Sequence, residues 1–169
     1  MPVVSIRAAR VGDIPAMQAI EADAAELFRG TGLIDLDDMD LFGDEALCGA
    51  IDDNLSFIAE VDGVAAGFVI GEVYGADGCL HELDVGLAHQ RMGIGARLVE
   101  TFCAQCKARG LHNVYLSTFR ELAWNAPFYA RLGFEEVSRD TYLPWMKTIE
   151  TEQARSLDIS KRLFMRRSL

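Results

Sequence analysis

A strand, a glycine-containing loop and a helix in direct succession constrain the fold of this chain more than any other feature. Cys79–Val85 has the composition of a strand, and a loop with the sequence Q-R-M-G-I-G follows at residues 90–95. Ile94, Leu98 and Phe102 then recur at helical spacing, which predicts an amphipathic helix. A strand that leads through a short loop into a helix is typical of a mixed α/β fold.

The loop is a candidate binding site for a phosphate-type anion. The first N–H groups of a helix lack intrahelical partners, and the helix dipole adds partial positive charge there. Gly93 and Gly95 place no side chain between this backbone and a ligand. The alternative is an ordinary tight turn between a strand and a helix. Leu98 occupies the third glycine position of a dinucleotide-binding fingerprint, and no Gly-Lys-Ser/Thr triplet of a P-loop occurs in the chain.

A second segment, W-N-A-P-F-Y-A-R-L-G-F at residues 124–134, favours the anion-binding interpretation of the loop over an ordinary turn. The two segments, in this order, resemble the GNAT superfamily of acyl-CoA N-acyltransferases. The matching residues are Gln90, Gly93 and Gly95 in the first motif and Asn125, Phe128, Tyr129, Gly133 and Phe134 in the second. The resemblance extends from about Val3 to Phe134, and the two motifs are its specific part.

The resemblance implies an α/β fold with mixed α+β character, formed by a single N-acetyltransferase domain over residues 1–169. The expected sheet is central, twisted and mostly antiparallel, and it is flanked by helices. A V-shaped splay is expected after the strand that precedes the pyrophosphate loop. The core motifs lie within residues 79–134, and a C-terminal helix and strand are expected within residues 144–169.

The resemblance also implies that acetyl-CoA binds and that coenzyme A is the product. The loop would bind the pyrophosphate, and the second motif would flank the pantetheine arm. The expected cofactor-binding residues are Leu83, Asp84, Val85, Gln90, Arg91, Met92, Gly93, Ile94, Gly95, Ala96, Asn125 and Phe128. Two departures from the family pattern are Met92, where many members have Arg or Lys, and Gly86-Leu87, which replaces a polar-Pro pair. Arg91 and Arg97 are the nearest cations.

The implied reaction is direct attack of an amine on the acetyl thioester in a ternary complex. A backbone N–H around Leu83–Val85 would polarise the carbonyl oxygen, and Tyr129 would protonate the departing thiolate. His81 and Glu82 are the candidate general bases, and water is the alternative. Strand alternation predicts that their side chains point to opposite faces. Asn125 could bind pantetheine, cap its helix, or do both.

Composition excludes several other classes of protein. The formal net charge of −10 and the pI near 4.7 argue against a nucleic-acid partner. No apolar stretch reaches the length of a membrane span, and the N-terminal residues do not resemble a signal peptide. We therefore expect a cytoplasmic location and no membrane partner. Cys103 and Cys106 lie on one helical face without matching histidines, which favours core packing over a metal site.

The remaining pattern predicts alternating strands and helices. Strands are expected at residues 3–9, 55–61, 64–74, 79–85, 112–118, 134–139 and near 163–165. Helices are expected from an N-cap at Asp13 to Phe28, after Gly43-Asp44, from the loop to Arg109, and over residues 124–132 and 144–157. Asp62-Gly63 and Asp77-Gly78 predict turns, and Gly133 is expected to end a helix.

The sequence therefore predicts an acetyl-CoA-dependent N-acetyltransferase that acts on a primary amine of a small molecule. A protein or peptide N-acetyltransferase and a non-catalytic acyl-CoA-binding module are the alternatives, and both a monomer and a homodimer are compatible with it. Six acidic residues lie within positions 35–45, in a segment that borders the acceptor cleft in this family. They raise the possibility of a cationic acceptor. A solvated acidic loop is the alternative for this segment.

Overall fold

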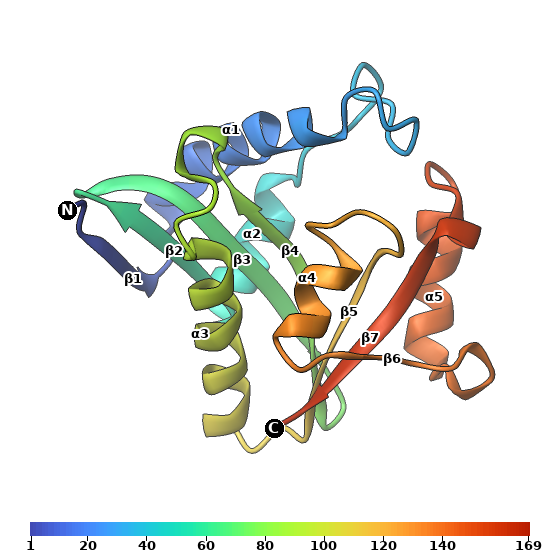
Figure 1. The fold of residues 1–169 in the computed structure, drawn as a ribbon. Coiled ribbons are helices and arrows are strands. Elements are labelled where there is room, and N and C mark those ends of the chain that lie inside the picture. The colour runs from blue at the N-terminus through green and yellow to red at the C-terminus, as the bar shows by residue number, and fades with distance from the viewer.

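The computed structural model describes residues 1–169, which form a seven-stranded sheet in the order β1-β2-β3-β4-β5-β7-β6 (Figure 1). The strands are β1 (Val4–Ala8), β2 (Ser56–Val61), β3 (Val64–Tyr74), β4 (Asp77–Val85), β5 (Asn113–Phe119), β6 (Glu135–Glu136) and β7 (Arg162–Ser168). Neighbouring strands are antiparallel except for the parallel pair β4–β5. This arrangement confirms the predicted α/β domain with a mostly antiparallel sheet.

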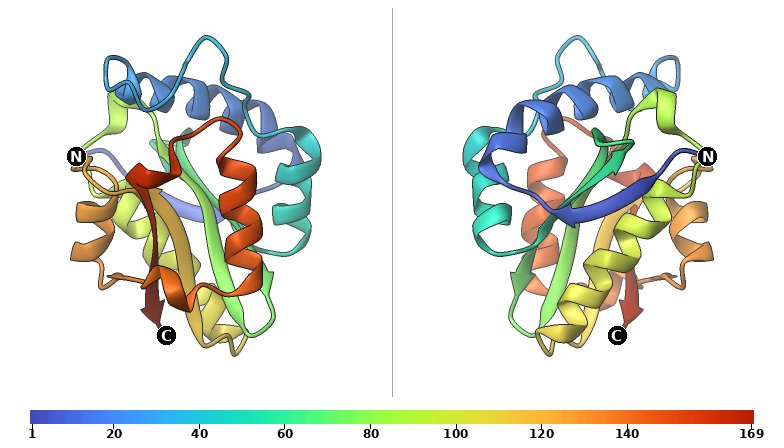
Figure 2. Two further views of the ribbon diagram at one scale, coloured as in Figure 1. Left: turned by 90° about the vertical axis from the view of Figure 1, so that its right-hand side faces the viewer. Right: turned by 90° about the vertical axis from the view of Figure 1, so that its left-hand side faces the viewer.

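Five α-helices cover the two faces of the sheet (Figure 2). They are α1 (Ile14–Ala25), α2 (Asp44–Asp52), α3 (Ile94–Ala108), α4 (Ala126–Arg131) and α5 (Pro144–Gln153). Short 3₁₀ helices are η1 (Val11–Asp13), η2 (Glu26–Phe28), η3 (Leu87–His89), η4 (Arg139–Thr141) and η5 (Ile159–Lys161). Helices α3 and α4 pack on one face in the largest apolar cluster, whereas α1, α2 and α5 pack on the other. Cys103 and Cys106 are buried in the α3 cluster, as core packing predicts.

The sheet opens between its two central strands. β4 and β5 are paired only from Gly78–Leu80 to Val114–Leu116, although β4 continues to Val85 and β5 to Phe119. The strands diverge beyond Leu80, as Figure 1 shows, and this is the expected V-shaped splay. The facing edges therefore carry backbone N–H and C=O groups that are not used in pairing between β4 and β5.

A β-bulge in β4 changes which side chains share a face. Ile70 pairs with Glu82 and Gly71 pairs with Leu80, so His81 is an extra residue in β4. Leu80 and Leu83 consequently both pack against the α3 cluster. His81 and Glu82 both turn to the opposite face, so the prediction from strand alternation was wrong. Gly71 is required here because a Cβ would lie 2.3 Å from Phe102 Cζ and 2.4 Å from the Cys79 carbonyl oxygen.

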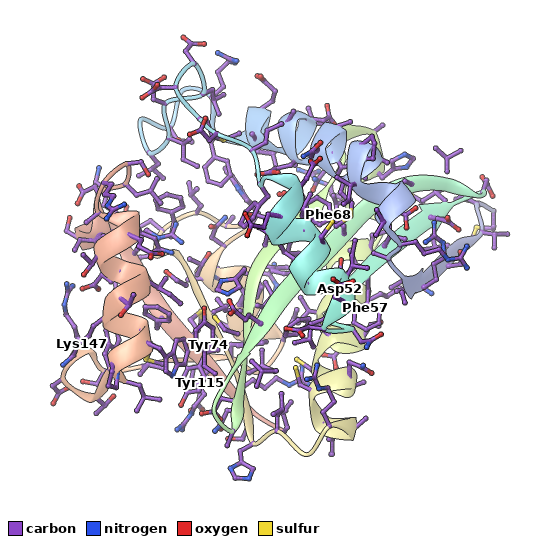
Figure 3. The ribbon with its side chains drawn as sticks, turned by 180° about the vertical axis from the view of Figure 1, so that it is seen from behind. Asp52, Phe57, Phe68, Tyr74, Tyr115 and Lys147 are labelled. Carbon is purple, nitrogen blue, oxygen red and sulfur yellow. The ribbon has the colours of Figure 1, made fainter.

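Helix α5 lies between β6 and β7 in the sequence and packs against β5 and β7. Figure 3 shows Tyr74 and Tyr115 beside this helix. Trp145 of α5 stacks on Tyr74 with ring centroids 4.5 Å apart and meets Tyr115 edge-on at 5.4 Å. These aromatic contacts fix α5 on the same face as α1 and α2.

Most predicted elements lie within a few residues of their observed positions, and three expectations are corrected. Asp77-Gly78 belongs to β4 rather than a turn, because Gly78 packs against Cys106 of α3. The strand predicted at 134–139 is limited to Glu135–Glu136. The helix predicted at 144–157 ends at Gln153.

Asp13 occupies the N-cap position of α1, but its side chain does not cap this helix. Its carboxylate instead accepts hydrogen bonds from the Arg7 guanidinium at 2.7 and 2.9 Å and from the Arg10 N–H at 2.7 Å. Arg7 also binds Glu60 of β2, so these ion pairs join the start of α1 to the edge of the sheet. No helix in the chain is both long and apolar enough to cross a lipid bilayer.

Candidate active site

A cleft of about 1210 Å³ passes through the opening between β4 and β5. On the α3 face it is lined by the loop that precedes α3 and by α4. On the opposite face it is lined by α1, α2 and part of α5. The splay thus connects the two faces of the sheet, and side chains from both faces reach one cavity.

The loop before α3 presents a row of free backbone donors to this cleft. No N–H group from Arg91 to Ala96 donates to another backbone group. Gly93 is the N-cap of α3 and has a φ of +74°, a left-handed conformation that favours glycine. The start of a fifteen-residue helix adds its dipole to these donors. The arrangement suits an anion such as a pyrophosphate.

The structure brings together all but one of the predicted cofactor-binding residues. The residues that line the cleft are Leu83, Asp84, Val85, Gln90, Arg91, Gly93, Ile94, Gly95, Ala96, Asn125 and Phe128. Met92 does not line it. The Gln90 amide donates to the Val85 carbonyl and so holds the loop on the end of β4. Arg97 donates to the Val4 carbonyl and does not line the cleft, whereas Arg91 does.

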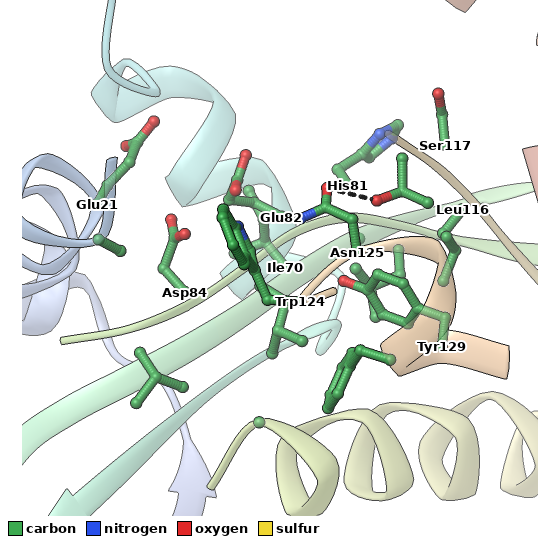
Figure 4. Close-up of a pocket in the computed structure, with 18 of the residues that line it drawn as sticks. Glu21, Ile70, His81, Glu82, Asp84, Leu116, Ser117, Trp124, Asn125 and Tyr129 are labelled. Carbon is green, nitrogen blue, oxygen red and sulfur yellow. Dashed lines mark hydrogen bonds between the residues drawn. The ribbon is translucent and has the colours of Figure 1, made fainter. Parts of the chain in front are cut away.

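Asn125 precedes α4 but does not cap it with its side chain. Its Oδ1 atom accepts a hydrogen bond of 2.7 Å from the Thr118 hydroxyl and a longer one, 3.4 Å, from the Phe119 N–H. Its Nδ2 group donates to no protein atom and lies in the cleft. The side chain is therefore held by β5, and its amide donor is available to a ligand (Figure 4).

Tyr129 reaches the same cleft from α4. Its side chain is 8% exposed and packs edge-on against Phe128 and Phe134, with ring centroids 5.0 and 5.8 Å apart. Its hydroxyl makes no hydrogen bond within the protein. Burial and the negative charges of Glu82 and Asp84 raise the pKa of Tyr129, so the hydroxyl keeps its proton at neutral pH.

His81 is engaged by two polar side chains at the α5 side of the cleft. Its Nε2 atom lies 3.3 Å from Glu72 Oε2 and 3.3 Å from the Tyr74 hydroxyl. Tyr74 in turn donates to Glu72 at 2.9 Å. Burial lowers the pKa of His81, although the charge of Glu72 opposes this effect.

Glu82 lies near the middle of the cleft, opposite Tyr129 and beside Asn125 (Figure 4). Its carboxylate forms no ion pair and accepts no hydrogen bond from a hydroxyl, amide or guanidinium side chain. Burial and the charge of Glu21 raise the pKa of Glu82 to about 7. Because this value is close to neutral, the carboxylate can both accept and release a proton under physiological conditions.

Two further carboxylates lie on the α1 side. Glu21 of α1 is 7% exposed, and both of its oxygens accept from the Phe42 N–H, at 3.2 and 3.0 Å. Asp84 of β4 has a buried Oδ2 atom that accepts from no backbone, hydroxyl, amide or guanidinium donor, and its carboxyl is within hydrogen-bonding range of the Glu82 carboxyl. Burial raises the pKa of both groups, and neighbouring carboxylates raise that of Asp84 further.

The acidic segment at residues 35–45 does not form the acidic border of the cleft that the sequence led us to consider. Its acidic residues do not line the cleft; they are Asp35, Asp37, Asp38, Asp40, Asp44 and Glu45. Apolar neighbours, including Ile34, Met39 and Phe42, line it instead. The structure therefore favours the solvated acidic loop, and the negative wall of the cleft comes from α1 and β4.

Sequence reasoning missed Glu21, Thr118 and Arg162. Glu21 had a usable signal, because it lies four residues after Met17 and three before Ala24 on the buried stripe of α1. Thr118 and Arg162 gave no local signal, since their contacts join distant segments. Arg162 of β7 donates to the Ser117 carbonyl at 3.1 Å and lies 4.5 Å from the centre of the Phe119 ring. Burial lowers the pKa of Arg162 to about 10.

The site combines a splayed sheet, a row of loop amides at a helix N-terminus, and the side chains of Tyr129 and Glu82 in one cleft, an arrangement suited to a transferase that binds an anionic cofactor. Residues 17–134 match the model of the acetyltransferase (GNAT) family, and the chain belongs to this family. The family assignment confirms the resemblance drawn from the two motifs.

Solved structures share the fold at low sequence identity. The PaiA N-acetyltransferase of Thermoplasma acidophilum in complex with coenzyme A has a TM-score of 0.77 at 15% identity, with 99% of each chain covered. The ribosomal-protein-S18-alanine N-acetyltransferase of Escherichia coli has a TM-score of 0.71 at 20% identity, with 98% of this chain and 94% of that chain covered. N-acetylglutamate synthase of Neisseria gonorrhoeae in complex with coenzyme A and N-acetyl-glutamate has a TM-score of 0.74 at 22% identity, and the match covers 99% of this chain but 35% of that one.

Proposed function

We propose that this protein transfers the acetyl group of acetyl-CoA to a primary amine of a small molecule by direct attack in a ternary complex. The observation that carries the proposal is the cleft through the splay. It places the amide row of the α3 loop and Tyr129 on one side of the opening and Glu82 on the other. Cofactor and acceptor can therefore approach one point from opposite faces of the sheet.

The chain's own residues supply the groups that would bind the cofactor. The N–H groups from Arg91 to Ala96 would hold the pyrophosphate, and the Arg91 side chain adds a positive charge in the cleft. The free Nδ2 group of Asn125 and the unpaired edge of β4 would hold the pantetheine arm. When bound, acetyl-CoA supplies an activated thioester carbonyl next to this edge.

The acid and base roles follow from the surroundings of each group. Attack forms a C–N bond and breaks the C–S bond, so the amine must lose a proton and the thiolate must gain one. We assign the first proton to Glu82, because its carboxylate is bound by no cation and faces the centre of the cleft. His81 is already engaged by Glu72 and Tyr74, which makes it the second candidate. Tyr129, whose hydroxyl keeps its proton, would donate to the sulfur.

The direct test is thiol release from acetyl-CoA with a panel of small amines and of peptides with free N-termini. Cys48 is the one cysteine that is not buried, so an enzyme-only blank corrects for its reaction with the thiol reagent. Turnover with small amines would support the proposal. Turnover with peptides alone would favour the protein-modifying alternative, which the ribosomal-protein N-acetyltransferase among the similar structures represents. Coenzyme binding without turnover on any amine would favour the non-catalytic binding module.

A further inference from the structure

The α1 side of the cleft contains a buried carboxylate oxygen, Asp84 Oδ2, that accepts no hydrogen bond from a backbone, hydroxyl, amide or guanidinium donor. The Asp84 carboxyl is within hydrogen-bonding range of the Glu82 carboxyl only, so the two acids must share a proton or face a donor that a ligand supplies. Glu21 lies on the neighbouring helix, and its oxygens share a single donor, the Phe42 N–H. Figure 4 shows both carboxylates on the same side of Glu82, away from Tyr129.

No cation of the protein pairs with these groups. Glu21, Glu82 and Asp84 take part in none of the seven ion pairs of the chain. Arg91 and Arg131 line the cleft near the cofactor loop and α4, and Arg162 is the remaining arginine in it. The Arg162 guanidinium is already bonded to Ser117 and Gln153 and lies over Phe119. The α1 side therefore gathers three carboxyl groups that no cation of the protein pairs with.

Apolar side chains also line this cleft. Phe28 at the end of η2, Ile34 and Met39 line the cleft, and Trp124 lines it from the segment before α4. An alkyl chain could lie against these side chains with a charged group at its end. A carboxylate on the acceptor would instead meet the buried acids, and like charges at close range disfavour binding.

We propose that the acceptor is a diamine or polyamine whose second, protonated amine binds between Glu21 and Asp84 while its first amine reacts beside Glu82 and Tyr129. This inference rests on the proposed function, since it names the substrate class of the same site. The reacting amine loses its proton and forms the amide, whereas the second amine stays charged and donates hydrogen bonds to the two carboxylates. One of these bonds would supply Asp84 Oδ2 with the donor that no backbone, hydroxyl, amide or guanidinium group provides.

The test compares linear diaminoalkanes with alkyl monoamines of equal chain length, using the wild-type protein and Glu21→Gln. The substitution keeps an oxygen acceptor for the Phe42 N–H and removes the negative charge. We expect wild type to favour the diamine by about tenfold or more in kcat/KM, the range of a charge-assisted hydrogen bond. Glu21→Gln should raise KM for the diamine at least about fivefold more than KM for the monoamine.

The double variant Asp37→Asn/Asp38→Asn is the matched control, because it removes acidic charge from the exposed segment that does not line the cleft. It should leave both KM values unchanged. Equal KM changes for the two amines in Glu21→Gln, or a wild type that does not prefer the diamine, would overturn the inference while leaving acetyl transfer intact.

Calorimetry separates this inference from the proposed function. Diaminobutane is titrated into the protein saturated with coenzyme A, for wild type, Glu21→Gln and Asp84→Asn. Binding that weakens about tenfold in each variant supports the carboxylate pair even if no amine is turned over. Binding that is absent in wild type, or that both variants preserve, contradicts it.

Discussion

The Thr118 hydroxyl donates a 2.7 Å hydrogen bond to Asn125 Oδ1 and thereby fixes the orientation of the Asn125 side chain. Thr118 lies in the part of β5 that no longer pairs with β4, and Asn125 precedes α4. The bond therefore joins the open edge of the sheet to the helix that carries Tyr129. It also leaves the Asn125 Nδ2 group as the donor that faces the cleft.

Thr118→Val should weaken acetyl-CoA binding, because Asn125 would lose its main restraint. The expected increase in Kd is about three- to tenfold, which corresponds to roughly 1 kcal/mol for one neutral hydrogen bond. Thr118→Ser keeps a hydroxyl and should bind as wild type does. Titration calorimetry with acetyl-CoA measures both values, and equal weakening in the two variants would show that packing rather than the hydroxyl matters.

Gly93→Val should abolish the rise in melting temperature that acetyl-CoA causes. A branched side chain at a φ of +74° would strain the loop and obstruct its N–H groups. Gly110 follows the other end of α3 and has a φ of +76°, and at either glycine an added Cβ would have no atom within 4 Å. Gly110→Val is therefore a control with similar strain.

Both glycine variants should melt at a lower temperature than wild type in the absence of ligand. Only Gly93→Val should lose the ligand-dependent increase. A normal increase in a folded Gly93→Val protein would remove this loop from the cofactor site.

Tyr129→Phe should lower kcat by roughly ten- to a thousandfold and preserve acetyl-CoA binding, because only the proton donor is lost. Tyr115→Phe is the matched control. Tyr115 is 7% exposed, close to the 8% of Tyr129, and it does not line the cleft. Steady-state kinetics from pH 6 to 9 on both variants gives the result, and unchanged turnover in Tyr129→Phe would reduce this residue to a packing role.

Glu82 should impose a pH dependence on catalysis. Because burial raises its pKa to about 7, kcat/KM should increase with pH up to about that value and then level off. Glu82→Gln should remove the increase and lower kcat/KM at pH 8 by roughly a hundredfold. Glu152→Gln, at the exposed margin of the same cleft, should keep the wild-type profile. A wild-type profile in Glu82→Gln would transfer the role of base to His81 or water.

The same carboxylate should also reduce stability at high pH. The folded protein holds this proton up to about pH 7, whereas the unfolded chain loses it near the ordinary glutamate pKa of 4.5. The contribution of this group to the free energy of unfolding is therefore highest below about pH 4.5 and falls as the pH rises to about 7. Glu82→Gln should be more stable than wild type by about 1–2 kcal/mol at pH 8, with a smaller difference at pH 5. Urea unfolding at the two pH values measures the difference.

The sequence by itself determined the order of elements and the two motifs. Strand Cys79–Val85, the loop with Gly93, and the periodic residues of α3 are local signals, because hydrophobic spacing and glycine act within a few residues. The same local information placed Asn125 and Tyr129 next to a short helix. It was sufficient to predict the family and to nominate the loop as the cofactor site.

Tertiary structure alone decided how the groups meet. The bulge at His81 depends on pairing with β3 and on the close approach of Gly71 to Phe102, so simple alternation predicted the wrong face. Glu21 enters the cleft because α1 crosses the same face of the sheet as Glu82. The burial of Glu82 and its proximity to Glu21, which together raise the pKa of Glu82, arise between segments far apart in the chain. Such long-range juxtaposition leaves no periodic pattern in a sequence.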